Sequence, residues 1–78
     1  MLTKQLKPAV EAILFLQHKP MPIYKIAETI DETIEPEHYK AAIDELIQDY
    51  QSNERGVELS EIAGGYAFRT KLEHRDMI

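Results

Sequence analysis

Residues 56–70 read Gly-Val-Glu-Leu-Ser-Glu-Ile-Ala-Gly-Gly-Tyr-Ala-Phe-Arg-Thr, and their pattern is the strongest indication of the fold class. Two short runs of alternating apolar and polar residues flank an Ala63-Gly64-Gly65 turn, a pattern typical of a β-hairpin with one buried face. The apolar residues that would share the buried face are Val57, Leu59, Tyr66 and Phe68. We expect the paired glycines to supply the positive φ angles of a tight hairpin turn.

Upstream of the hairpin, apolar residues recur at the three- and four-residue spacing of amphipathic helices. A first helix is expected over residues 5–17 and should end before the Lys-Pro-Met-Pro run at residues 19–22, which cannot continue it. A shorter second helix is expected over residues 23–30. A third should open with Glu35 as its cap residue and Pro36 at its first helical position.

Helices followed by a hairpin predict an α+β fold, a winged helix-turn-helix with three helices and a C-terminal β-hairpin wing. This domain is expected to cover residues 1–70. Residues 71–78 show no clear pattern and are expected to begin a linker toward a second winged-helix domain outside this chain. The expected core consists of Leu6, Val10, Ile13, Leu14, Ile26, Ile43, Leu46, Ile47, Leu59 and Phe68. A core this small only just offsets chain entropy, so help from a partner is expected.

Charge separates DNA binding from protein binding, the two usual roles of a winged helix. The chain has 14 acidic and 9 basic residues, a formal net charge of -5 and a pI of about 5.1. Residues 28–54 hold nine acidic residues and one basic residue, Lys40, a net charge of -8 that we call the acidic segment. A DNA reader would place the third helix in the major groove, where its acidic side chains would repel phosphate. We therefore expect no direct specific DNA binding by this domain.

A winged-helix DNA-binding transcriptional regulator remains the alternative, because basic residues near the wing offer contacts to a DNA backbone. These are Arg55, Arg69, Lys71 and Arg75. Solvated charges on an exposed hairpin face are the simpler interpretation.

Catalytic, metal and cofactor chemistry has little support in the sequence. The chain has no cysteine, and His18, His38 and His74 do not have the spacing of metal ligands. It lacks a nucleophile motif and a phosphate-binding glycine loop. We expect no catalytic activity, metal, cofactor or small-molecule substrate. The absence of a signal peptide and of a membrane-length apolar run favours a cytoplasmic protein that does not bind membranes.

Aromatic residues exceed what one small core needs. Phe15 lies nine residues after Leu6, which places it on roughly the opposite side of the first helix from the apolar stripe. It therefore needs a second surface to pack on. Tyr24 and Tyr66 are also surplus to the expected core, and tyrosine is a frequent anchor at protein interfaces.

Several short runs of the sequence form a recognisable set. They are residues 6–15 (Leu-Lys-Pro-Ala-Val-Glu-Ala-Ile-Leu-Phe), 19–23 (Lys-Pro-Met-Pro-Ile), 26–28 (Ile-Ala-Glu), 56–59 (Gly-Val-Glu-Leu), 63–66 (Ala-Gly-Gly-Tyr) and 69–71 (Arg-Thr-Lys). Together they resemble the amino-terminal domain of the segregation and condensation protein B (ScpB) family over nearly the whole chain. One departure is Pro22, where that family tends to have a serine- or threonine-like helix start.

The resemblance implies a non-enzymatic subunit of the bacterial SMC–kleisin condensin complex, which acts in chromosome condensation and partition. It further implies a homodimer that binds the kleisin subunit ScpA and, through it, SMC. The acidic segment agrees independently with a protein-binding role, and a dimer interface should avoid it because like charges repel. No interface motif transfers residue by residue, so the candidate interface residues rest on their expected exposure. They are Leu6, Phe15, Tyr24 and Tyr66.

Overall fold

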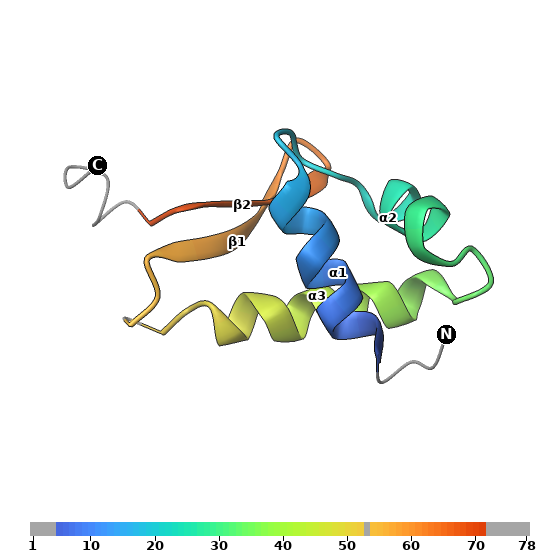
Figure 1. Cartoon of the computed structure of the whole chain (residues 1–78), viewed down its shortest axis with the longest axis horizontal. Coiled ribbons are helices and arrows are strands. Elements are labelled where there is room, and N and C mark those ends of the chain that lie inside the picture. The colour runs from blue at the N-terminus through green and yellow to red at the C-terminus, as the bar shows by residue number, and fades with distance from the viewer. Residues whose placement is uncertain (1–4, 53, 72–78) are drawn as a thin grey trace.

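The computed structural model describes residues 5–52 and 54–71, and its elements follow the order that the sequence predicts (Figure 1). They are α1 (Leu6–Leu16), α2 (Ile23–Ile30), α3 (Pro36–Asp49), β1 (Val57–Ile62) and β2 (Gly65–Thr70). Both α1 and α2 pack on α3, and the antiparallel β1–β2 hairpin packs against α1 and α3. The prediction of a winged helix-turn-helix with a C-terminal hairpin wing is confirmed.

The helix ends follow local chemistry. The first helix is one residue shorter at each end than predicted, with Gln5 and Gln17 as its cap residues. The third begins at Pro36 after Glu35, as predicted, although the Glu35 side chain makes no capping hydrogen bond. The carbonyl oxygen of Glu35 instead accepts a hydrogen bond of 3.0 Å from the His38 N–H. Pro36 suits the first position because it has no N–H to leave unsatisfied there.

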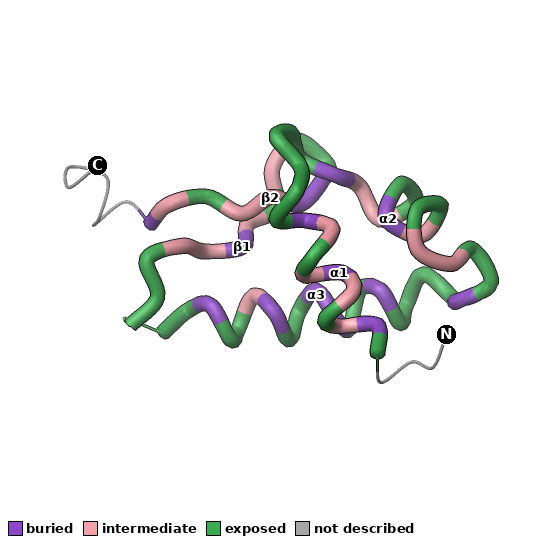
Figure 2. The backbone as a smooth tube through the Cα atoms, viewed as in Figure 1, coloured by how far each residue is buried: buried purple, intermediate pink, exposed green. Residues whose placement is uncertain are grey.

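The core lies where α1, α3 and the hairpin meet, and buried and exposed residues alternate along α3 as one covered face requires (Figure 2). Seven of the ten expected core residues are buried: Leu6, Val10, Leu14, Ile26, Ile43, Leu46 and Leu59. Ile13, Ile47 and Phe68 lie half-buried at its margin. Met21, Ile34 and Tyr39 are also buried, and the Tyr39 hydroxyl donates a hydrogen bond of 2.6 Å to the Asp31 carbonyl oxygen.

The hairpin turn differs from the prediction in which residues have positive φ. Ala63 and Gly64 are the two turn residues, with φ of 50° and 81°, and Gly65 is already the first residue of β2. A two-residue turn of this kind requires positive φ at both central positions, so the chain accepts an alanine in the left-handed region. The expectation that the paired glycines supply both angles is therefore wrong for Gly65.

Gly65 is needed for a different reason, the close approach of another backbone segment. A Cβ atom at this position would lie 2.8 Å from the Met21 nitrogen and 2.9 Å from the Pro20 carbonyl carbon. The approach exists because Met21 forms an isolated β-bridge with Tyr66. The N–H of each residue donates to the carbonyl oxygen of the other at 2.9 Å. The sequence analysis treated residues 19–22 only as a corner, whereas they also add a one-residue third strand to the wing.

The last described residue is still part of the domain. The Lys71 N–H donates to the Gly56 carbonyl oxygen at 3.0 Å, and its ammonium donates to the Ser52 carbonyl oxygen. The linker is expected over residues 71–78, and all of these residues except Lys71 lie outside the described residues.

Replacing Gly65 by Ala should lower the free energy of unfolding by about 1 to 3 kcal/mol, because the new methyl group must push the Met21 backbone away. Gly56→Ala is the matched control, since no atom lies within 4 Å of a Cβ there and its φ is not positive. Its free energy of unfolding should stay within about 0.5 kcal/mol of the parent. Urea unfolding measures both, and equal stabilities of the two variants would contradict the role given to Gly65.

Candidate protein-interaction surface

Three large hydrophobic side chains are exposed among the described residues, and all lie at or near the corner between α1 and α2. Phe15 is 52% exposed, Leu16 is 76% exposed and Tyr24 is 67% exposed. The first two end α1, and Tyr24 is the second residue of α2. Phe15 and Tyr24 are thus on the surface, as a contact with a partner requires. Leu16 was missed as a candidate, although the expected core also leaves it out.

The other two candidate interface residues are buried. Leu6 is 2% exposed and Tyr66 is 4% exposed, so the expectation that they are accessible is wrong. Leu6 faces the core with Val10 and Leu14 on the same stripe of α1. Tyr66 is held by the bridge to Met21, and the Lys40 ammonium lies 5.8 Å from the centre of its ring. Leu6 and Tyr66 therefore contribute to the core of the domain. Phe15 and Tyr24 remain as candidate interface residues.

Phe15 belongs to a cluster of three aromatic rings. Its ring stacks on Phe68 of β2, with centroids 4.2 Å apart and ring planes 10° apart. Tyr50, at the end of α3, meets Phe68 edge-on at 4.9 Å and Phe15 at 6.3 Å. The sequence analysis expected Phe15 to need a second surface to pack on, and Phe68 provides that surface. One face of the Phe15 ring is covered and fixed, while half of the side chain stays open to solvent.

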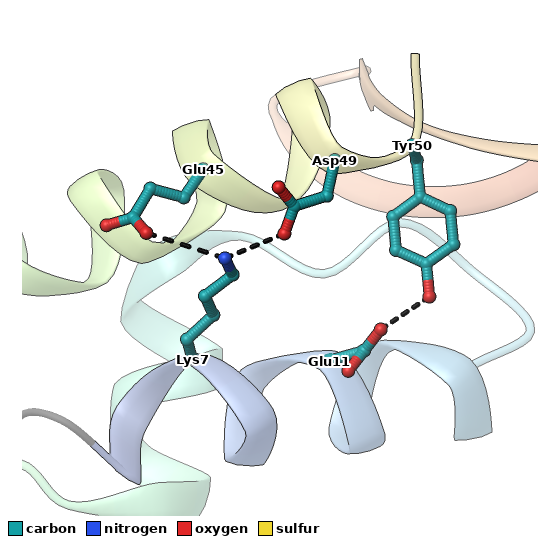
Figure 3. A network of polar contacts seen from close by, with 5 residues as sticks. All are labelled: Lys7, Glu11, Glu45, Asp49 and Tyr50. Carbon is teal, nitrogen blue, oxygen red and sulfur yellow. Dashed lines mark hydrogen bonds and ion pairs between the residues drawn. The ribbon is translucent and has the colours of Figure 1, made fainter. Parts of the chain in front are cut away.

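Polar contacts fasten α1 to α3 beside this cluster (Figure 3). The Lys7 ammonium lies 2.7 Å from Asp49 Oδ2 and 3.4 Å from Glu45 Oε1. The hydrogen bond to Asp49 is the main cause of the raised pKa of Lys7. The Tyr50 hydroxyl donates to Glu11 Oε2, and this bond, followed by burial, raises the pKa of Tyr50. Because every contact joins residues far apart in sequence, the sequence patterns could not reveal them.

The outer side of α3 is acidic, as predicted. Glu37, Asp44, Glu45 and Asp49 are all exposed, and the last two also pair with Lys7 of α1. Lys40 is paired with Asp44 at 2.8 Å, so the only basic residue of α3 is already neutralised. In a helix-turn-helix reader this is the helix that enters the groove, and here it presents carboxylates where phosphates would lie.

Basic residues near the wing are engaged inside the domain. The Arg55 guanidinium lies 4.9 Å from the Tyr50 ring centre, and Arg69 Nε lies 3.6 Å from Glu58 Oε1. The ammonium of Lys71 donates a hydrogen bond to the Ser52 carbonyl oxygen. Arg75 lies outside the described residues. Three of the four candidate DNA-backbone contacts therefore already have partners within the domain.

Within residues 5–52 and 54–71, no three histidine or acidic side chains are grouped so that they could hold a metal ion. In the same part of the chain, no helix has the length and apolar character needed to cross a membrane. His74 falls outside these ranges.

Fold and surface together define a winged-helix domain with an acidic third helix and an exposed apolar corner. Residues 8–78 match the family model described as segregation and condensation complex subunit ScpB. A segregation and condensation protein B from Geobacillus thermodenitrificans is 38% identical over 69 residues, which are 87% of this chain and 32% of the relative. One from Syntrophotalea carbinolica is 33% identical over 76 residues, 97% of this chain and 38% of the relative. The chain belongs to the ScpB family, and it spans about a third of the length of these relatives.

Solved structures give the same fold. A crystal structure of a dimer of the ScpB N-terminal domain complexed with an ScpA peptide matches with a TM-score of 0.84 and 35% sequence identity. That match covers 95% of this chain and 84% of the other. The crystal structure of ScpB from Mycobacterium tuberculosis matches with a TM-score of 0.84 at 16% identity, over 99% of this chain and 47% of that one, and supports the fold alone.

Replacing Tyr50 by Phe tests the fastening of α1 to α3. At neutral pH the variant should lose about 1 to 3 kcal/mol of stability, because the hydroxyl no longer donates to the Glu11 carboxylate. The raised pKa of Tyr50 means that this contribution is complete below about pH 10 and is lost as the pH rises through the folded-state value. Denaturant unfolding of parent and variant from neutral to alkaline pH measures the difference.

Tyr24→Phe is the control for this experiment, since the exposed Tyr24 hydroxyl makes no hydrogen bond to the described residues. It should unfold like the parent at every pH. A stability difference between parent and Tyr50→Phe that does not shrink above pH 10 would rule out the hydrogen bond as its cause.

Proposed function

We propose that this domain is a non-enzymatic part of a bacterial SMC–kleisin condensin complex. In this function it pairs with a second copy and binds the kleisin ScpA, and through ScpA the SMC subunit, during chromosome condensation and segregation. The observation that carries the proposal is the match to a dimer of the ScpB N-terminal domain complexed with an ScpA peptide. The match covers most of both chains at 35% identity, so the same domain is being compared. A cytoplasmic protein, associated with the nucleoid through the complex, follows from this role.

The charge distribution supports a protein partner over DNA. The acidic segment includes α3, the helix that a DNA reader would use, and Lys40 there is already paired. Protein partners tolerate or even select such a surface, whereas a duplex repels it.

We assign Phe15 to the contact between the two copies. Its ring is held flat against Phe68, so little side-chain entropy remains to be lost when the open face is covered. Phe15 lies outside the acidic segment. Two copies that met through the acidic segment would instead bring like charges together. A symmetric pair is the simplest closed arrangement of two identical chains. Burying Phe15 in it would also add apolar contacts that a domain of this size lacks.

The parent chain should sediment as a dimer at high micromolar concentration, and Phe15→Glu should sediment as a monomer because it buries a charge in the contact. Gln48→Glu is the control: it adds the same charge at an exposed position of α3 and should leave the dimer intact. ScpA pull-down should retain less kleisin with the monomeric variant, since pairing completes the partner surface. Melting curves check that both variants are folded.

A parent chain that stays monomeric at high micromolar concentration would refute the dimer. Unchanged dimerisation of a folded Phe15→Glu variant would refute only the assignment of Phe15 to the contact.

The alternative function, a DNA-binding transcriptional regulator, makes the opposite prediction. We expect no saturable, sequence-dependent binding of duplex DNA by this domain at physiological ionic strength, because α3 presents carboxylates. Fluorescence anisotropy with a mixed library of labelled duplexes measures this. A specific complex tighter than about micromolar, weakening steeply with salt, would favour the regulator.

A further inference from the structure

The exposed hydrophobic residues coincide with a second feature, the lack of negative charge. Residues 12–27 contain no aspartate or glutamate and are the longest acid-free run of the chain. Phe15, Leu16 and Tyr24, the three exposed large hydrophobic residues of the described chain, all fall within it. The acidic segment begins directly afterwards, at residue 28. The domain thus has an apolar, acid-free corner beside a strongly acidic remainder.

The same corner also carries two exposed lysines. Lys19 and Lys25 are exposed, and their side chains make no ion pair, hydrogen bond or ring contact within residues 5–52 and 54–71. The other described basic side chains all have such a partner: Lys7, Lys40, Arg55, Arg69 and Lys71. Two lysines without partners in so acidic a chain are therefore concentrated at one place.

The start of α2 adds to this positive character. Its cap residue is Pro22, which makes no side-chain capping hydrogen bond, and no acidic residue lies in the first turn. Helices normally place acidic or capping side chains there, because the first N–H groups are unsatisfied and carry partial positive charge. Lys25 stands in that turn instead. The arrangement is unfavourable within the isolated domain and favourable beside an external carboxylate.

We define the corner surface as the exposed side chains of Leu16, Lys19, Tyr24 and Lys25. We propose that it binds an amphipathic segment of a partner protein, whose large apolar residues cover Leu16 and Tyr24 while its carboxylates lie against Lys19 and Lys25. In the complex proposed above, this segment belongs to the kleisin, so the assignment of the partner rests on that function. The adjacent Phe15 is left for the contact between copies.

Two other occupants fit the surface less well. A second copy placed corner to corner would bring the lysines of both chains together, which opposes pairing there. An anionic lipid surface is usually held by four to eight clustered basic residues, and the two lysines here stand beside the acidic segment, which such a membrane repels. An acidic, apolar protein segment satisfies both the apolar and the charged groups.

The test measures binding of ScpA from the same organism to the full chain by isothermal titration calorimetry. The double variant Lys19→Glu, Lys25→Glu should bind at least about tenfold more weakly, because like charges then oppose in place of opposite ones. Leu16→Ser should also weaken binding without changing its salt dependence. The matched control, Lys40→Glu with Arg69→Glu, makes the same change in net charge elsewhere and should bind within about twofold of the parent.

Salt provides a second readout. Parent affinity should fall as salt is added, while the Lys19→Glu, Lys25→Glu variant should lose this dependence or reverse it. Vesicles containing phosphatidylglycerol and duplex DNA serve as the other probes. Parent binding to either one that the lysine variant abolishes would overturn the proposal in favour of that ligand.

The outcomes separate this inference from the proposed function. If ScpA fails to bind the parent chain at all, the function proposed for the domain fails and the corner surface loses its assigned partner. If ScpA binds the parent, the corner variants and the control alike, only the corner surface is refuted. Binding weakened equally by both charge variants would also refute it, since net charge alone would then explain the effect.

Discussion

Two hydrogen bonds between Met21 and Tyr66 determine how the helices and the wing are joined. They fix the α1–α2 corner to the hairpin, so that α1, α2 and the wing have one relative arrangement. They bury Tyr66 in the core, and they require a glycine at position 65 because no Cβ fits beside the Met21 backbone. Proline on both sides of Met21 limits the added strand to one residue, since neither proline can donate to a longer ladder. The corner is thereby tied to the hairpin, while Leu16 and Tyr24 beside it stay exposed.

A second set of contacts fastens the domain on the side of α3. Phe15, Phe68 and Tyr50 join α1, β2 and the end of α3 through ring contacts, and Tyr50 also bonds to Glu11. Lys7 offsets two carboxylates where α1 approaches the acidic helix, which lets these two helices pack without repulsion. Lys40 and Arg69 likewise pair with carboxylates, whereas Arg55 lies against the Tyr50 ring and Lys71 donates to the Ser52 carbonyl oxygen. Among the described lysine and arginine side chains, only Lys19 and Lys25 at the corner have no partner within the domain. The corner therefore differs from the side of α3 in having positive charges that are free to bind a partner.

Local patterns predicted the elements well and non-local contacts poorly. Helical spacing and the Glu35–Pro36 start located the helices to within about a residue, because these signals lie within one turn of the chain. The same reasoning misplaced Tyr66 and misread Gly65, since both depend on Met21, which is more than forty positions away in the sequence. For the candidate site, helix geometry placed Phe15 outside the core stripe but could not name Phe68 as its support. Single-residue bridges and ring stacking leave no periodic signature from which they could be predicted.

The arrangement of charge explains how a winged helix can serve protein binding without losing its fold. The core residues of α3 are apolar and remain in place, so the helix packs as it would in a DNA reader. Only its outer side chains differ, and their carboxylates remove the attraction to phosphate that such a reader needs. The exposed apolar groups lie instead at the α1–α2 corner, away from the helix that would face a groove. A partner bound at the corner, as proposed above, would leave the outer side of α3 uncovered. Under the proposed function, the negative charge of α3 disfavours binding to DNA, and the apolar corner offers a separate surface to a protein partner.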